Sequence, residues 1–201
     1  MSRLSIFKVI VFLLALLPLA RLVYGALTNN LGVNPVEFMT RFTGDWAMHF
    51  LLITLAITPL RKLTGWTWLI KFRRMMGLYV FFYACLHFLT YIWFDQFFNV
   101  GEIIQDIIKR PFITIGFISL MLLIPLAVTS NQAMMRRLKH NWQKLHRLVY
   151  PISLLVMLHY FMMIKADYKE ALIYLAILLI LLAYRLPFIS QKIFFLRHVV
   201  K

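Results

Sequence analysis

The chain has 201 residues, of which 62% are hydrophobic and only 14% are charged, and its mean hydropathy is +0.80. A soluble domain is about half apolar and about a quarter charged, so this chain cannot hide its apolar surface in one water-soluble core. The composition excludes a soluble enzyme, a disordered chain and, despite a net charge of +15, a nucleic-acid-binding protein. The single cysteine, Cys85, excludes a disulfide framework and a CxxC motif.

Six segments are apolar over about the 20 residues that a membrane-spanning helix needs. The sequence therefore predicts an all-α membrane protein, a six-transmembrane-helix bundle that forms a single domain over residues 1–201. Prolines lie within these segments or at their ends, where neighbouring helices satisfy the carbonyl groups that the prolines free. The segments, in chain order, are Phe7–Leu27, Gly44–Leu60, Met75–Phe94, Phe112–Val128, Leu148–Ile164 and Ala171–Leu186.

The first segment follows Arg3 and Lys8 and resembles a secretory signal peptide at first sight. Its apolar run is longer than that of a usual signal peptide, and no clear small-x-small cleavage site precedes Asn29. We interpret the segment as an uncleaved first helix.

Charge is distributed unevenly between the two sides of such a bundle. Most of the 22 Lys and Arg residues fall in four stretches on one side, which are residues 1–8, 61–74, 129–147 and the tail from 185. All 7 acidic residues fall on the opposite side. The positive-inside rule therefore predicts that both termini are cytoplasmic (N-in, C-in). The net charge is then a topology signal that also attracts anionic membrane lipid.

Two histidines, His87 and His159, lie deep in the third and fifth segments, which run in the same direction. His87 follows Arg74 by the same number of residues as His159 follows His146. At 1.5 Å per residue, both lie about 20 Å from the cytoplasmic ends of their helices. Ionisable groups inside a membrane are costly and indicate function, so these two imidazoles at one depth are the candidate site.

Such a pair suits the axial coordination of a haem, for which histidine is an established ligand. Aromatic residues nearby supply an apolar slot, and a neutral iron-bound nitrogen avoids a buried charge. Zinc fits less well, because it takes three or four ligands and no Asp or Glu is predicted at this depth. The remaining alternative is two unrelated histidines, each bonded to a backbone carbonyl.

A third histidine, His146, lies at the inner edge of the fifth segment, about 220° around an ideal helix from His159. Pro151 between them could kink the helix and change that relation. In a two-haem bundle His146 would be an inner ligand, but the facing position on the third segment holds Arg73 and Arg74. Those arginines suit an anion such as the phosphate of a flavin nucleotide, or they anchor lipid headgroups.

Other residues have open roles. His49, early in the second segment, either faces the same cavity as the pair or bonds a neighbour. Arg21, near the outer end of the first segment, either snorkels outward or meets a haem propionate. His140 and His198 belong to basic cytoplasmic segments, and Cys85 is a small packing residue.

In combination, several stretches of the chain resemble the MsrQ (YedZ) family of the ferric-reductase-like transmembrane superfamily, which also contains NADPH oxidases and STEAP reductases. The similarity covers nearly the whole chain, and the combination is specific although no single stretch is. The stretches are Thr58-Pro59-Leu60, Arg73-Arg74-Met75-Met76-Gly77-Leu78 leading to Leu86-His87, Thr129-Ser130, Trp142-Gln143-Lys144-Leu145-His146-Arg147-Leu148-Val149-Tyr150 and Leu158-His159-Tyr160.

The resemblance implies b-type haem, bound FMN and a role as the haem-binding membrane subunit of the MsrPQ protein-methionine-sulfoxide reductase system. Electrons would pass from the quinone pool or a cytoplasmic flavin reductase, across a bacterial inner membrane, to the periplasmic molybdopterin enzyme MsrP. The haem ligands would be His87 and His159, with His146 as a third haem- or flavin-associated histidine. FMN is expected at the inner basic rim, beside Arg73, Arg74, Trp142 and His146.

The chain departs from the oxidase members of the superfamily in two respects. It lacks their inner histidine on the third segment, and no FAD and NADPH domain follows the sixth segment, so we expect a separate electron donor. The outer loops, about 28–43 and 95–111, hold most of the acids and are the predicted docking surface for MsrP. Two other functions remain open, a quinone- or metal-reducing cytochrome b with another partner and a non-redox transport bundle.

Overall fold

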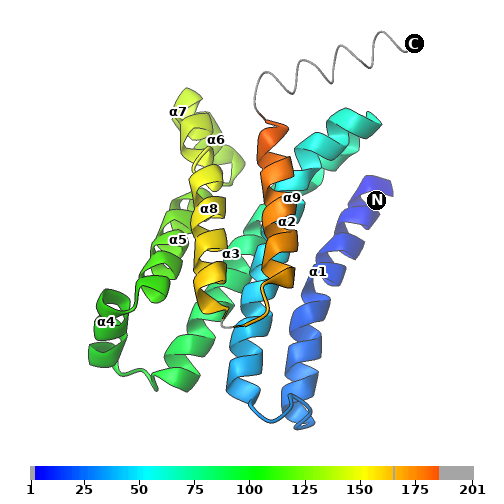
Figure 1. Ribbon diagram of the computed structural model, residues 1–201. Coiled ribbons are helices and arrows are strands. Elements are labelled where there is room, and N and C mark those ends of the chain that lie inside the picture. The colour runs from blue at the N-terminus through cyan, green and yellow to red at the C-terminus, as the bar shows by residue number, and fades with distance from the viewer. Residues whose placement is uncertain (1–2, 165, 186–201) are drawn as a thin grey trace.

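In the computed structural model, which describes residues 3–164 and 166–185, the chain is a bundle of helices, and these residues contain no strand (Figure 1). The all-α fold is therefore confirmed. The 3-10 helix η1 leads into α3, and the π-helical turn η2 continues it. The elements are α1 (Arg3–Leu27), α2 (Pro35–Thr64), η1 (Thr67–Phe72), α3 (Arg73–Thr90), η2 (Tyr91–Asp95), α4 (Val100–Lys109), α5 (Pro111–Val128), α6 (Gln132–Leu138), α7 (His140–His146), α8 (Val149–Met163) and α9 (Lys169–Ala183).

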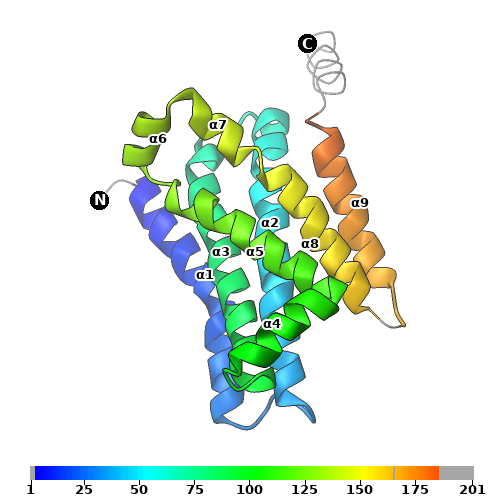
Figure 2. The same cartoon turned by 90° about the vertical axis from the view of Figure 1, so that its left-hand side faces the viewer.

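The long helices α1, α2, α3, α5, α8 and α9 run in alternating directions, as Figures 1 and 2 show from two sides. One end of the bundle, here called the basic end, carries η1, α6 and α7 together with the start of α1. The other end, here called the acidic end, carries α4 and the starts of α2 and α9. Within the described residues, the basic and the acidic segments thus lie at opposite ends of one bundle.

Four helical stretches are long and apolar enough to cross a membrane, namely Leu4–Leu27, Thr67–Asp95, Pro111–Val128 and His140–Met163. They correspond to the first, third, fourth and fifth predicted segments. Among the remaining described helices, α9 has only 15 residues, and α2 carries charged side chains toward both of its ends. The bundle is thus of the membrane type with four candidate spans, and a count of six stays a prediction.

Several helices differ in extent from the predicted segments. α2 begins at Pro35, ahead of its apolar run, because the Asn34 side chain accepts a hydrogen bond from the Glu37 N–H (3.2 Å) and proline suits the first helical position. The short helices α4, α6 and α7 lie in stretches predicted as loops. The predicted end of the sixth segment at Leu186, and the basic tail with His198, lie outside the described residues.

The core lies chiefly between α2 and α3, which pack against each other along their length. Phe50 of α2 stacks on Tyr79 and Tyr83 of α3, with ring centroids 5.2 Å apart in each pair. The second close helix pair is α5 and α8. By contrast, α1 exposes most of its large apolar side chains between Ile6 and Leu17, as a helix that faces lipid does.

A proline inside α1 disturbs backbone groups to which α3 supplies a partner. Pro18 has no N–H, and its ring clashes with the preceding turn. The fully buried Tyr83 hydroxyl donates to the Ala15 carbonyl (2.9 Å) and accepts from the Leu19 N–H (3.2 Å). One side chain of α3 therefore satisfies both a carbonyl and an N–H at the break in α1.

Replacing Tyr83 with Phe tests this account of the junction between α1 and α3. The substitution removes the hydroxyl that bonds the Ala15 carbonyl and the Leu19 N–H, and a buried group left without a partner costs about 1–3 kcal/mol. We expect a clearly lowered midpoint of thermal unfolding in detergent, followed by loss of helical signal. Tyr24→Phe, which removes a hydroxyl from a side chain of α1 that is 68% exposed, should leave the midpoint unchanged. Equal effects of the two substitutions would contradict the account.

Candidate functional site

The structure brings His87 of α3 and His159 of α8 together. Their ring centroids are 6.1 Å apart and their planes are inclined by 76°. Both side chains line a cavity of about 640 Å³ that opens toward the acidic end, a volume within the usual range for cofactor pockets. Its walls are mostly apolar and come from both helix pairs, with Leu51, Val80, Ala84, Phe88, Phe117, Leu120, Leu123 and Val156 among them.

Each of the two imidazoles is fixed by a backbone carbonyl of the neighbouring helix. His87 Nδ1 lies 2.8 Å from the Thr40 oxygen on α2, and His159 Nδ1 lies 2.7 Å from the Phe112 oxygen on α5. A carbonyl oxygen can only accept, so Nδ1 carries the proton in both rings. In the neutral imidazole the lone pair then lies on Nε2. This is how proteins commonly orient histidines that bind a metal through the other nitrogen.

The donor set and the cavity fit a haem between two axial histidines. Two orientated imidazoles offer one Nε2 lone pair each, and the apolar walls suit a macrocycle. A zinc site does not fit, because nowhere in residues 3–164 and 166–185 do three or more His, Cys, Asp or Glu side chains gather to hold a metal ion. Both rings do bond backbone carbonyls, which was the alternative to ligation. The bonds use Nδ1 and leave Nε2 free, so carbonyl bonding and ligation are compatible.

Charged residues at the mouth of this cavity were missed by the sequence analysis. Arg41 and Arg110 both line it, and each pairs with an acid one helical turn away. Arg41 contacts Glu37 at 2.7 Å and Arg110 contacts Asp106 at 2.9 Å. The helix that positions Arg41 begins before the apolar run of the second segment, so a search confined to that run could not include it.

Two other expectations have definite outcomes. His49 bonds a neighbour, because its Nε2 lies 2.9 Å from the Tyr174 hydroxyl of α9, and it is not among the residues that line the cavity. Arg21 lies with its guanidinium over the Phe42 ring, 5.8 Å from the centroid, and it too is outside the cavity lining.

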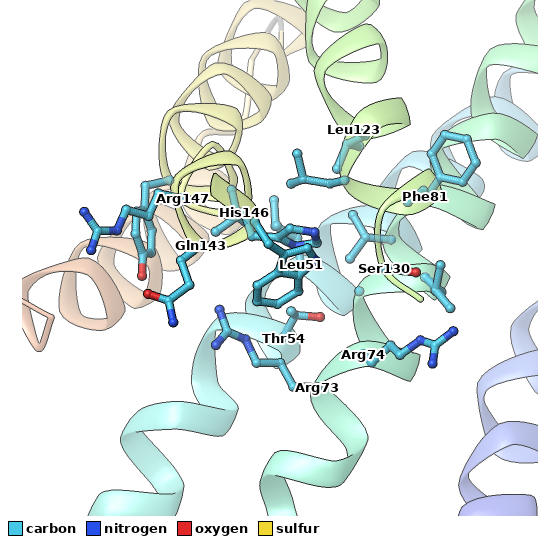
Figure 3. Close-up of a pocket in the computed structure, with 18 of the residues that line it drawn as sticks. Leu51, Thr54, Arg73, Arg74, Phe81, Leu123, Ser130, Gln143, His146 and Arg147 are labelled. Atoms are coloured by element: carbon cyan, nitrogen blue, oxygen red, sulfur yellow. The ribbon is translucent and has the colours of Figure 1, made fainter. Parts of the chain in front are cut away.

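A second pocket, of about 520 Å³, opens toward the basic end. Figure 3 shows its polar residues, and the guanidinium of Arg73 turns toward Gln143 whereas that of Arg74 points away. Arg73 is half-buried and Arg74 is exposed, so the two arginines are not one paired site. The pocket brings together all four residues expected there (Arg73, Arg74, Trp142 and His146) and adds Ser130, Gln143, Arg147 and Tyr150.

His146 is held rigidly in this second pocket. The Trp142 ring stacks on it, with centroids 4.0 Å apart. Its Nε2 lies 3.1 Å from the Thr129 hydroxyl, which itself lies 2.6 Å from the Pro125 carbonyl and donates its only hydrogen there. His146 Nε2 must therefore be the donor to Thr129. Its Nδ1 is left as the nitrogen with a lone pair, unlike the arrangement at His87 and His159.

The two pockets are adjacent. Leu51, Val80 and Leu123 line both of them, so the cavity of the two histidines and the basic pocket share part of their walls. A group bound in one pocket and a group bound in the other would lie close together within one bundle.

Arg185, at the end of α9, places a further positive charge beside the basic pocket. It donates to the Tyr150 hydroxyl (2.8 Å) and to the Leu55 carbonyl (2.6 Å). Pro59 explains the second bond, because Leu55 is the residue four positions before it and proline cannot donate to that carbonyl. The Nε atom of Arg185 is buried without a hydrogen-bond partner. The hydrogen bonds that the Arg185 guanidinium donates to Tyr150 and Leu55 thus go to uncharged oxygen atoms.

Comparison with known proteins agrees with this geometry. Residues 43–157 match the family model described as "Ferric reductase like transmembrane component". A protein of Herminiimonas arsenicoxydans is 53% identical over 94% of this chain and 88% of its own length. One of Rhodospirillum rubrum is 53% identical over 89% of this chain and 86% of its own. One of Azospira oryzae is 47% identical over 91% of this chain and 79% of its own.

All three relatives are named protein-methionine-sulfoxide reductase heme-binding subunit MsrQ. No solved structure matches the chain. A helical bundle with candidate membrane spans and a matching family model defines a ferric-reductase-like transmembrane protein. Within that class, identities near one half over most of the chain show that it belongs to the MsrQ family.

A double-mutant cycle tests the link between Arg185 and Pro59. In Arg185→Met the Leu55 carbonyl loses its donor, at a cost of about 1–3 kcal/mol. In the Pro59→Ala background residue 59 regains an N–H that reaches this carbonyl, so the same substitution should be less harmful by a comparable amount. Unfolding free energies of the four proteins in detergent measure the coupling. An effect of Arg185→Met that is equal in both backgrounds would show that the bond is not needed.

Proposed function

We propose that this chain is a haem b electron-transfer subunit, which passes electrons from the quinone pool or a cytoplasmic flavin reductase across the inner membrane to the periplasmic molybdopterin enzyme MsrP. The reduction serves the repair of oxidised methionine in periplasmic proteins. Membership of the MsrQ family supports the proposal, and the single structural observation that carries it is the facing pair of histidines.

His87 and His159 are the proposed axial ligands. Their ring centroids lie 6.1 Å apart, so the two rings would hold one metal centre through Nε2, and the carbonyls of Thr40 and Phe112 hold both rings in the tautomer that ligation needs. A haem in this position supplies reversible one-electron transfer. The protein supplies the ligands, the apolar walls of the cavity and the fixed orientation of the rings.

The basic pocket is the proposed site of FMN. Arg73 is half-buried in the pocket wall and offers its guanidinium group to a phosphate, and the wall also includes Trp142. His146 is the third cofactor-associated histidine. The lipid-headgroup role suits Arg74 better, since its side chain is exposed and points away from Gln143 in Figure 3.

The proposed topology has six spans with both termini in the cytoplasm. Alternating helix directions, with the basic connections at one end and the acids at the other, support it. α2 and α9 would be the two further spans. α2 packs along α3 in the core, whereas α9 packs against α8 and α2 at the edge of the bundle and exposes an apolar face. The acidic end, which includes loops 28–43 and 95–111, is then periplasmic and is the proposed docking surface for MsrP.

Substituting His87 or His159 with Ala tests the function directly. Either change removes one axial ligand, so purified protein should lose most of its haem, measured as pyridine haemochrome per protein. The dithionite-reduced wild-type haem should be reoxidised on mixing with oxidised MsrP, followed by its absorption bands. Neither alanine variant should transfer electrons in this assay.

His49→Ala is the matched control, because His49 bonds Tyr174 outside the cavity lining. It should keep full haem content. Full haem content in both His87→Ala and His159→Ala would refute the ligand assignment. A haem that is retained by wild type but not reoxidised by MsrP would favour a quinone- or metal-reducing cytochrome b instead.

Arg73→Gln tests the flavin site. A guanidinium hydrogen bond to a charged group contributes about 1.5–3 kcal/mol, so the substitution should weaken flavin binding about tenfold or more and leave haem content intact. Flavin fluorescence after acid extraction measures the bound fraction. Arg137→Gln, which removes an exposed guanidinium of α6 outside the pocket lining, is the control. Equal flavin content in wild type and both variants would place the flavin elsewhere.

A further inference from the structure

The two histidine sites share one local design. In both, the Nδ1 atom meets a carbonyl that lies 47 residues earlier in the chain, Thr40 for His87 and Phe112 for His159. Four residues after each of those carbonyls, on the same helix, there is a glycine: Gly44 on α2 and Gly116 on α5. The α2–α3 pair and the α5–α8 pair therefore hold their histidines in equivalent ways.

Each glycine lies directly against its imidazole. A Cβ atom at position 44 would lie 3.0 Å from His87 Nδ1, and a Cβ atom at position 116 would lie 2.9 Å from His159 Cε1 and 3.0 Å from its Nδ1. These separations are shorter than ordinary van der Waals contact. Any side chain larger than hydrogen at either position would displace the ring, the helix or both.

The position of the glycines has a simple geometric reason. In an α-helix the carbonyl of residue i accepts from the N–H of residue i+4, so Thr40 and Phe112 are the helical partners of Gly44 and Gly116 themselves. A carbonyl oxygen has a second lone pair, and the imidazole N–H reaches it by passing over residue i+4. A Cβ at that residue stands in this path.

We propose that Gly44 and Gly116 are positioning residues, which let the two imidazoles reach the second lone pair of a helix carbonyl and thereby set the orientation of the haem ligands. The inference rests on the proposed haem site. Neither glycine needs to touch the cofactor. Their role is to fix the tautomer and the angle of each ring, and in this way the axial ligand field.

The competing explanation is that the glycines merely allow close helix packing. Gly77 of α3 provides the matched control for the haem readouts, because it lines the basic pocket and not the histidine cavity, and a Cβ there would find only Thr54 Cγ2, at 3.9 Å. Alanine is favoured over glycine in a helix by about 1 kcal/mol, so Gly77→Ala should be neutral or stabilising. Helix propensity alone would make Gly44→Ala and Gly116→Ala stabilising. A destabilising effect of either substitution would therefore indicate a clash between the new Cβ atom and the imidazole.

The first experiment measures haem content, the low-spin ferric EPR signal and the midpoint potential of Gly44→Ala, Gly116→Ala and Gly77→Ala. EPR of a ferric haem responds to the angle between its axial imidazoles. We expect at least a twofold loss of haem or a clear change of EPR signal and potential in the first two variants, and wild-type values in Gly77→Ala. Wild-type haem content, EPR signal and potential in both of the first two variants would overturn the proposal.

A second experiment needs no haem and covers the case in which the single variants fold poorly. Removing the ring relieves the clash, so Gly44→Ala should cost less stability, or recover folded yield, in a His87→Ala background, and Gly116→Ala should do so in a His159→Ala background. If Gly→Ala lowers the stability equally with and without the histidine ring, the glycines serve helix packing alone and the inference is overturned. If instead His87→Ala and His159→Ala keep their haem, the ligand assignment fails, while the coupling between each glycine and its ring is still measured independently.

Discussion

A hydrogen-bonding group inside an apolar bundle must find its partner within the protein, since the surrounding lipid offers none. Two imidazoles meet this requirement by bonding carbonyls of neighbouring helices that already accept a helical bond. His87 uses Thr40 and His159 uses Phe112. The bond satisfies one nitrogen, fixes the ring and leaves the other nitrogen with a free lone pair in the cavity that both rings line. The same interaction therefore stabilises the fold and prepares a ligand.

The backbone groups near Pro18 and Pro59 also find hydrogen bonds within the protein. Pro18 breaks the hydrogen bonding of α1, and Tyr83 inserts its hydroxyl between a carbonyl and an N–H at the break. Pro59 frees the Leu55 carbonyl, and Arg185 donates to it from α9. In each case a polar side chain from outside the interrupted helix bonds the backbone group near the proline. The prolines in α1 and α2 are therefore sites of hydrogen bonding between different parts of the bundle. Prolines that would weaken an isolated helix here help to specify which helices pack together.

Apolar runs and charge asymmetry were enough to predict an all-helical bundle, because both depend only on composition along the chain. Equal depth of His87 and His159 was likewise predictable from helical rise, and the structure places the two ring centroids 6.1 Å apart. Residues that matter through contact between helices were not predictable. Gly44 and Gly116 acquire meaning only when each is seen beside the ring on the next helix. Their common spacing to the two histidines was a signal in the sequence, but it identifies the glycines only once the histidines are known to pair.

The two pockets differ in the tautomer and in the charge that their residues impose. At the acidic end, the arginines of the cavity mouth are paired with Glu37 and Asp106. At the basic end, the described residues include no acid, and Arg185 and His146 are held by hydroxyl and carbonyl oxygens instead. A pocket whose cations have no carboxylate partner favours an anionic ligand, whereas the apolar cavity around two neutral imidazoles favours a flat metal complex. Leu51, Val80 and Leu123 line both pockets, so the two sites are adjacent, and under the proposed function the difference in charge would direct a flavin phosphate to the basic pocket and a haem to the apolar cavity.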